Sequence, residues 1–381
     1  MPLELYIHLP FCLKKCRYCD FLSFPLEKKT ISLYMAALLD EIRQMANHIN
    51  AYEFVNHSVQ SIFLGGGTPS LLEPDQIRML LDCLRGHFYI EESAEISMEA
   101  NPGTLTREKL IAAYEAGINR LSIGLQSTDD LMLRRLGRIH SFKQFLNNYE
   151  MAREVGFDNI NIDLMSGLPG QTLTDWKETL STVVSLRPDH ISAYSLIIEE
   201  GTPFAEDSLI LSNLPDEETD RQMYEITGEF LAAQGYRRYE ISNYALPGKE
   251  CRHNMGYWEG TPYLGFGLGA SSYYHHARFS NESDISKYIK DPFVPFHLRA
   301  DYEEQTKKQE MEDRMIFGLR MMKGVSREEF KREFGVEMDE MFGSVIDKYI
   351  LYGLMEDNEG RVCLTDSGID VSNRIFEEFL L

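Results

Sequence analysis

The feature that most constrains the fold is a regular alternation of short β-rich runs with longer helical runs in the first half of the chain. The β-rich runs lie at Leu5–Leu9, Val59–Leu64, Ala94–Glu99, Arg120–Leu125, Asn159–Leu164 and His190–Leu196. The helical runs between them are Ser32–His48, Pro74–Phe88, Arg107–Ala116, Phe142–Val155 and Leu173–Ser185. Such alternation is typical of a parallel sheet covered by helices. It predicts an α/β fold, either an open sheet or a (β/α) barrel, with ligand sites at the carboxyl ends of the strands.

The remainder of the chain separates into two regions. From Tyr236 to about Pro295 the sequence is rich in Gly, Tyr and His and shows no regular period. From about Ala300 it predicts helices again, at Met311–Lys323, Ser326–Phe334 and Met338–Tyr352, then a hairpin at Met355–Leu364 and a last helix at Asp366–Phe379. We therefore expect a core over residues 1–235, an irregular extension over 236–299 and a mainly helical, winged-helix-like domain over 300–381.

Charge and apolar content narrow the class of protein. A formal net charge of −22 over 381 residues disfavours binding to nucleic-acid phosphates and to anionic membranes. The start of the chain lacks the basic and apolar regions of a signal peptide, and no run reaches the roughly 18 apolar residues of a membrane helix. We expect a cytoplasmic protein without membrane insertion, in which clustered cysteines are metal or redox groups rather than disulfides.

Three of the six cysteines, Cys12, Cys16 and Cys19, lie close together just past the first predicted strand. A loop with thiolates at this spacing can give one sulfur to each of three irons of an iron–sulfur cluster, which usually has four cysteine ligands. Phe21 stands where a fourth thiol would fit, so one iron needs a ligand from elsewhere. The alternative is a zinc ion with His8 or Asp20 as the fourth ligand.

A run of three glycines, Gly65–Gly67, follows the second predicted strand and precedes Thr68 and Pro69. Without Cβ atoms, this strand end lets backbone N–H and C=O groups approach a ligand closely. Taken alone, the run is equally compatible with a tight turn. Together with the cysteine spacing it resembles the radical S-adenosylmethionine (SAM) superfamily. That resemblance implies a [4Fe-4S] cluster whose open iron is chelated by the amino and carboxylate groups of SAM, with the glycines holding the amino group.

Polar residues occur at the carboxyl ends of strands that should otherwise be apolar. They are Glu99, Gln126, Asp163 and Ser195, each near the end of a different predicted strand. Any one of them could be a loop cap or a hydrogen-bonded strand end. Four at the same edge of a sheet favour a ligand-binding rim, where a carboxylate could accept hydrogen bonds from a ribose and Arg138 could meet a carboxylate.

Within that superfamily the chain is similar to the oxygen-independent coproporphyrinogen III oxidase family. The shared strings, spread over nearly the whole chain, include YIHLPFC at 6–12, GGGTP at 65–69, QS at 126–127 and GLPGQT at 167–172. The resemblance implies that the core is an incomplete (β/α)6 barrel. It also implies that SAM is surrounded by Tyr6, Tyr18, Gly66, Gly67, Thr68, Glu99, Gln126, Arg138, Asp163 and Ser195.

Two departures from the oxidase pattern disfavour the oxidase reaction itself. Phe21 replaces the fourth cysteine, and the first predicted strand begins almost at Met1, without the oxidase's N-terminal extension.

A further string, HNMGYW at residues 253–258, resembles the signature of a heme-binding branch of this family, whose members hand heme to acceptor proteins. An imidazole can take an axial position on heme iron, and Tyr257 and Trp258 offer flat surfaces to a porphyrin. The resemblance makes His253 the candidate heme ligand, with Cys251 as an alternative. From the residues alone, a structural role is favoured, in which His253 bonds backbone groups.

The expected function is therefore heme binding and heme delivery on a radical SAM scaffold. Its partners would be heme and an acceptor protein, such as a respiratory membrane protein. The alternative is a coproporphyrinogen III oxidase-type radical SAM enzyme, and reductive cleavage of SAM could accompany either function. A DNA-binding role is disfavoured, because acidic residues outnumber basic ones over 301–381.

Overall fold

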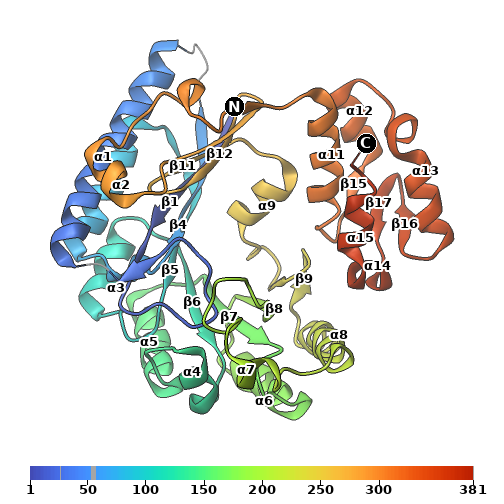
Figure 1. Ribbon diagram of the computed structural model, residues 1–381, viewed down its shortest axis with the longest axis horizontal. Helices are drawn as coiled ribbons and strands as arrows, with labels where there is room; N and C mark the ends of the chain where they lie inside the picture. Colours follow the sequence, from blue (N-terminus) through green and yellow to red (C-terminus); the bar gives the residue numbers. More distant parts are fainter. Residues whose placement is uncertain (26, 53–56, 381) are drawn as a thin grey trace.

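Six parallel strands paired in chain order form the centre of the computed structural model, which describes residues 1–25, 27–52 and 57–380 (Figure 1). The strands are β1 (Pro2–Leu9), β4 (Ser58–Gly66), β5 (Ile90–Ala100), β6 (Arg120–Gln126), β7 (Ile160–Ser166) and β8 (His190–Ser195). Each pairs in parallel with the next, whereas β1 and β8 pair outward with later strands. The predicted α/β fold is confirmed, and the open ring of six strands is an incomplete (β/α)6 barrel.

Helices cover the outer face of this sheet (Figure 1). They are α1 (Lys28–Tyr52), α2 (Pro74–His87), α3 (Arg107–Glu115), α4 (Asp130–Leu136), α5 (Phe142–Val155), α6 (Leu173–Ser185), α7 (Ser208–Leu211) and α8 (Glu217–Ala233). Helix α2 shows how they pack, since Ile77, Leu81 and Leu84 lie on one face and are fully buried. The helices predicted between the strands are all present. Helices α4 and α7 are additional, because their seven and four residues are too few to show an apolar period in the sequence.

The segment from 236 to 299 is more regular than expected. It contains β9 (Arg237–Arg238), β10 (Asn243–Ala245), α9 (Arg252–Glu259), β11 (Tyr263–Phe266), β12 (Ser271–Tyr274), β13 (Ala277–Ser280) and α10 (Ile285–Lys290). Strand β10 adds to β8, and β11 adds to β1, followed by β12, β13 and β14 (Glu303–Glu304). Strands this short carry too few residues to show a period of two in the sequence.

Residues 307–377 form a helical unit with its own hydrophobic cluster. Its elements are α11 (Lys307–Gly318), β15 (Val325–Ser326), α12 (Arg327–Phe334), α13 (Met338–Leu351), β16 (Met355–Asn358), β17 (Arg361–Leu364), α14 (Asp366–Asp370) and α15 (Ser372–Glu377). Met315, Phe330 and Phe342 are fully buried in this cluster. The order of helices and hairpin is as predicted, but the prediction of a single last helix was wrong. It is interrupted at the β-branched Val371, where φ is −118° and ψ is 19°.

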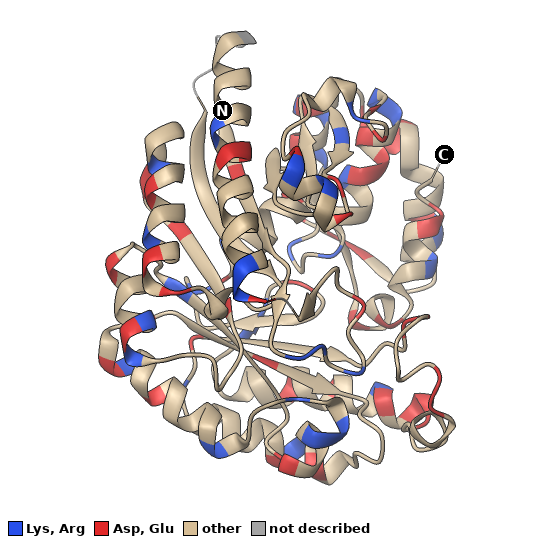
Figure 2. Ribbon diagram, turned by 60° about the vertical axis from the view of Figure 1, so that its left-hand side comes forward, with Lys and Arg blue, Asp and Glu red and all other residues tan. Residues whose placement is uncertain are grey.

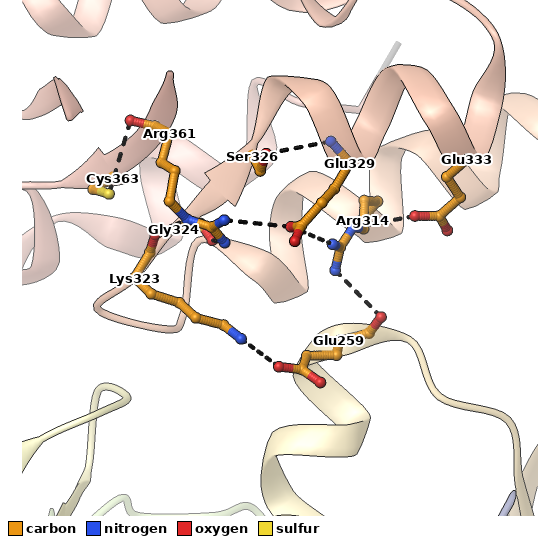
Figure 3. Close-up of polar contacts among 9 residues, drawn as sticks. All are labelled: Glu259, Arg314, Lys323, Gly324, Ser326, Glu329, Glu333, Arg361 and Cys363. Carbon is orange, nitrogen blue, oxygen red and sulfur yellow. Dashed lines mark hydrogen bonds and ion pairs between the residues drawn. The ribbon is translucent and has the colours of Figure 1, made fainter. Parts of the chain in front are cut away.

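The C-terminal unit rests against the end of α9 through polar contacts (Figure 3). The Glu259 carboxylate pairs with Lys323, and the Glu259 carbonyl accepts a hydrogen bond from Arg314 Nη1 at 3.2 Å. Arg314 also pairs with Glu329 at 3.7 Å and with Glu333 at 3.4 Å. Acidic and basic residues are interleaved over the outer helices of the molecule (Figure 2). Among the described residues, none of the helices has the length and apolarity needed to span a membrane.

Candidate functional site

The cysteine loop follows β1 and closes on itself over the carboxyl ends of the strands. Its two ends pair as β2 (Phe11–Cys12) and β3 (Phe24–Pro25). Arg17 fastens the middle of the loop, because its N–H donates to the Leu136 carbonyl at 3.0 Å and its guanidinium pairs with Asp207 at 2.7 Å. The three cysteines are therefore carried on a loop that is fixed to the rest of the core.

Close packing requires the glycine run at the end of β4. A Cβ on Gly67 would lie 2.6 Å from the Phe11 carbonyl oxygen, and one on Gly66 would lie 2.5 Å from the His8 imidazole. Gly66 also has a φ of +102°, which side chains disfavour. Its N–H donates to Glu99 Oε2 at 3.1 Å. The glycines thus let β4 pass beside the cysteine loop and aim a backbone donor at a rim carboxylate.

Two carboxylates lie near each other at this rim. Burial, and secondly the charge of Asp163, raises the pKa of Glu99 to about 8. Asp163 accepts hydrogen bonds from Ser122 Oγ at 3.1 Å and from Asn161 Nδ2 at 2.6 Å. Glu99 is therefore mostly protonated at neutral pH, and a cationic ligand would favour its charged form.

Gln126 and Arg138 extend the rim from the end of β6 and the loop after α4. Gln126 has a φ of +71°, and its Oε1 accepts a hydrogen bond from Tyr194 at 3.0 Å. Arg138 Nη2 donates to Asn101 Oδ1 at 3.0 Å, while Nη1 lies 3.7 Å from Cys16 Sγ. Within the described ranges, the buried Nε of Arg138 has no hydrogen-bond partner. The guanidinium therefore keeps a donor for a ligand.

One cavity of about 560 Å³ brings all the predicted site residues together. Some of them already have protein partners: Ser195 Oγ donates to Asp220 at 2.5 Å, and the Tyr6 hydroxyl bonds to His8 Nδ1 at 3.0 Å. The predicted residues in its lining are Tyr6, Cys12, Cys16, Tyr18, Cys19, Gly66, Gly67, Thr68, Glu99, Gln126, Arg138, Asp163, Ser195 and His253.

The donor set fits an iron–sulfur cluster better than a single metal ion. In the part of the chain that the structure describes, no three His, Cys, Asp or Glu side chains are placed to bind one ion. His8 uses both ring nitrogens, for Tyr6 at 3.0 Å and for the Leu22 carbonyl at 2.8 Å. Burial raises the pKa of the Cys19 thiol, so a positively charged partner is needed to hold its thiolate. Either kind of metal site supplies that charge, but a cluster takes the three thiolates on separate irons, so they need not converge on one ion.

Comparison with known proteins gives the same assignment at the level of family. The chain matches the Radical SAM superfamily over residues 6–183 and the HemN C-terminal domain over residues 305–371. Proteins named heme chaperone HemW are 38% identical in Bacillus subtilis, covering 98% of both chains, and 35% identical in Lactococcus lactis, covering 100% of this chain and 98% of that one. This chain belongs to the HemW family.

A solved structure extends the comparison from the HemW family to a related enzyme. The coproporphyrinogen III oxidase HemN from Escherichia coli, described as a radical SAM enzyme, matches with a TM-score of 0.85 at 26% identity. The match covers 99% of this chain and 90% of that one. This member of the HemW family therefore shares the fold of HemN over both its core and its C-terminal unit.

In this HemW-family chain the HNMGYW string lies on α9, between the sheet and the C-terminal unit (Figure 1). Glu95 of β5 accepts hydrogen bonds from Arg252 N at 3.1 Å and His253 N at 3.5 Å, at the N-terminus of the helix. A Cβ on Gly256 would lie 2.0 Å from Glu4 Oε1 of β1. Helix α9 is thus bonded to the sheet at its N-terminus and packs closely against it at Gly256.

His253 is only 1% exposed and has partners on both ring nitrogens. Nδ1 is bonded to Ser61 Oγ at 2.7 Å and Nε2 to the Tyr257 hydroxyl at 2.9 Å. Burial lowers the pKa of His253 to about 3. Coordination of heme iron would require one of these bonds to break, and the role of His253 as a heme ligand stays a prediction. Its partners are side chains, not the backbone groups expected from the sequence.

The cavity of this HemW-family chain also contains polar residues that the strand-end argument missed. They include Asn101, Arg120, Ser122, Asn161, Ser192 and Tyr194. Along β6, alternate residues from Arg120 to Gln126 line the cavity, as do alternate residues from Asn161 to Met165 of β7 and Ser192 and Tyr194 of β8. Polar residues at a period of two were the available signal, because alternate strand residues share a face. They show that the inner face is polar along the strands, not only at their ends.

Proposed function

We propose that this protein binds heme and transfers it to acceptor proteins, on a radical SAM scaffold that holds a [4Fe-4S] cluster and SAM. The observation that carries the proposal is near full-length similarity, at 34–38% identity, to proteins named heme chaperone in three bacteria. The cavity that gathers three thiols, a glycine strand end and two carboxylates supports the scaffold assignment. The proposed acceptor is a heme-containing protein, such as a respiratory membrane protein.

In this proposal Cys12, Cys16 and Cys19 would each bind one iron, and SAM would take the fourth. When bound, the cluster supplies electrons to SAM. Glu99, beside the glycine strand end, would accept hydrogen bonds from the amino group of SAM. Arg138, whose buried Nε has no partner among the described residues, would donate to its carboxylate. The remaining predicted residues of the cavity would enclose the nucleoside.

The second candidate function is oxidation of coproporphyrinogen III, which the TM-score of 0.85 to Escherichia coli HemN favours. Phe21, which is 61% exposed and lines the cavity, offers no thiol at the position where the oxidase pattern has a cysteine. An anaerobic assay under reducing conditions separates the two functions. Formation of protoporphyrinogen from coproporphyrinogen would establish the oxidase reaction.

Heme titration of the anaerobically reconstituted protein tests the main proposal. We expect a saturable change in the Soret band, followed by movement of heme to an added apo-acceptor. A reconstituted protein that leaves the Soret band of free heme unchanged would contradict heme binding.

The cluster ligands can be tested independently of heme. Cys16→Ser is expected to lose most of the iron and sulfide of the reconstituted protein, because one cluster iron loses its thiolate. Cys83→Ser is the matched control, since Cys83 lies on α2 and contacts the Leu39 carbonyl, outside the cavity. Equal iron content in both variants would refute the ligand assignment.

A further inference from the structure

A second cavity, of about 860 Å³, lies beside the start of β1, between β11–β13 and α11. Aromatic rings from separate elements line it, including Trp258 of α9, Tyr273 of β12 and Phe317 of α11. Helix α9 stands between the two cavities, since Tyr257 lines both of them. We propose that this second cavity is the seat of heme and that His276 is the ligand of its iron. The inference rests on the proposed heme-binding function.

His276 sits in an unusual backbone conformation at the edge of this cavity. Strands β12 and β13 pair through Tyr274 and Ala277, so His275 and His276 form a two-residue turn. Their φ angles are +50° and +58°. Asn-Gly is the favoured pair for such a turn, and residues held in a disfavoured conformation cluster at functional sites. Because two imidazoles lie at the edge of an aromatic cavity, we infer that this turn does more than connect β12 to β13.

The contacts of His276 suit a metal ligand. Its Nδ1 bonds to the Glu310 carboxylate, which also accepts a hydrogen bond from the Tyr273 hydroxyl at 3.0 Å. A histidine that binds a metal typically donates its other ring N–H to a carboxylate, which fixes the ring and raises its basicity. Coordination would use Nε2 of His276. The side chain of His276 is 76% exposed, whereas His253 is 1% exposed and bonded through both nitrogens.

The volume and rings of the cavity suit a flat aromatic macrocycle. Its volume falls in the range of about 300–1,000 Å³ typical of small-molecule sites. Within the described residues, the buried indole Nε1 of Trp258 has no hydrogen-bond partner. Arg278 lies over the Phe317 ring at 5.6 Å and pairs with Asp313 at 2.6 Å. The other charged residues in the lining are the basic Lys307 and Arg314 and the acidic Asp301, Glu310 and Glu333. The rings would stack on a porphyrin, and Arg278 and Lys307 would meet its propionates.

His276→Asn and His275→Asn form a matched pair of variants for testing the iron ligand. Asparagine tolerates the left-handed backbone of this turn, so both variants are expected to fold. In the reconstituted full-length protein, His276→Asn should weaken heme binding at least about tenfold and shift the Soret band, because the iron loses its ligand. His275→Asn should bind heme as wild type does. Metal-free protoporphyrin IX should bind equally to both variants.

Ser271→Trp tests the cavity itself. Ser271 lines the cavity, shares a face of β12 with Tyr273 and is exposed, so an indole there fills the space without removing a core contact. This variant should lose both heme and protoporphyrin IX binding, with unchanged iron content and melting temperature. Wild-type heme affinity in His276→Asn and Ser271→Trp would overturn the inference, as would loss of heme in a folded His253→Ala alone. A wild-type protein that binds no heme would refute the proposed function as well.

Discussion

At the scale of single residues, the structure predicts an unusual pH dependence for Glu4. Glu4 is 3% exposed, and burial raises its pKa to about 9 from an ordinary value of 4.5. The folded chain therefore keeps a proton that the unfolded chain releases, so this residue's contribution to stability is lost as pH rises from 4.5 towards 9. Glu4→Gln should flatten the dependence of the free energy of unfolding on pH between about 5 and 8, measured by urea denaturation.

Glu92→Gln is the control for this prediction. Glu92 is exposed on β5, so the substitution removes a carboxylate without removing a buried proton. Glu92→Gln should leave the dependence of the free energy of unfolding on pH as it is in the wild type. An unchanged slope in Glu4→Gln would mean that Glu4 is charged in the folded protein.

The same scale shows what the sequence could and could not indicate about the site. Cys16 and Glu99 were predictable, because a thiol cluster and a carboxylate at a strand end carry their chemistry in the sequence. Arg120 was not predicted, although it is 2% exposed and lines the cavity. It begins β6, and its role depends on Glu95 and Cys251, whose side chains lie near it only in the folded chain.

At the scale of elements, the position of α9 depends on the absence of a side chain at Gly256. A Cβ there would lie 2.0 Å from Glu4 Oε1. Gly256→Ala should therefore push α9 from β1 and destabilise the protein by about 1–3 kcal/mol, the usual cost of overpacking. Thermal unfolding followed by circular dichroism measures this loss.

Gly86→Ala provides the matched control on another helix. Gly86 lies in α2, and a Cβ at this position would meet no atom within 4 Å. The substitution should be neutral or stabilise the protein by up to about 1 kcal/mol, because alanine favours helix. Equal effects of the two substitutions would show that α9 does not pack against Glu4 as described.

Long elements with a clear apolar period were predictable from the sequence, and short elements were not. Phe142–Val155 and Leu173–Ser185 were predicted with the observed bounds, since each helix shows several turns of apolar periodicity. The strands β9 to β13 have two to four residues each and exist through their pairing with one another and with β8 and β1. Helix α9 has eight residues and depends on the Glu95 carboxylate at its N-terminus. These elements follow from tertiary contacts that no local pattern encodes.

At the scale of the whole molecule, the C-terminal unit forms one wall of the second cavity. Phe317 and Arg314 of α11 line it, opposite the strands of the core. The ion pair between Glu259 and Lys323 fastens that wall to the end of α9 (Figure 3). Displacement of the C-terminal unit would therefore widen the cavity.

A charge reversal tests whether this ion pair holds the wall in place. Glu259→Lys would set a third cation beside Lys323 and Arg314, so the C-terminal unit should loosen and heme, if bound in the second cavity, should dissociate faster. The side chains of Glu259 and Lys323 are 40% and 52% exposed, so the pair itself should contribute less than about 1 kcal/mol. Hydrogen exchange in α11 measures the loosening.

The double variant Glu259→Lys/Lys323→Glu restores opposite charges and should return exchange towards the wild-type rate. Wild-type exchange in Glu259→Lys alone would show that this ion pair does not hold the wall.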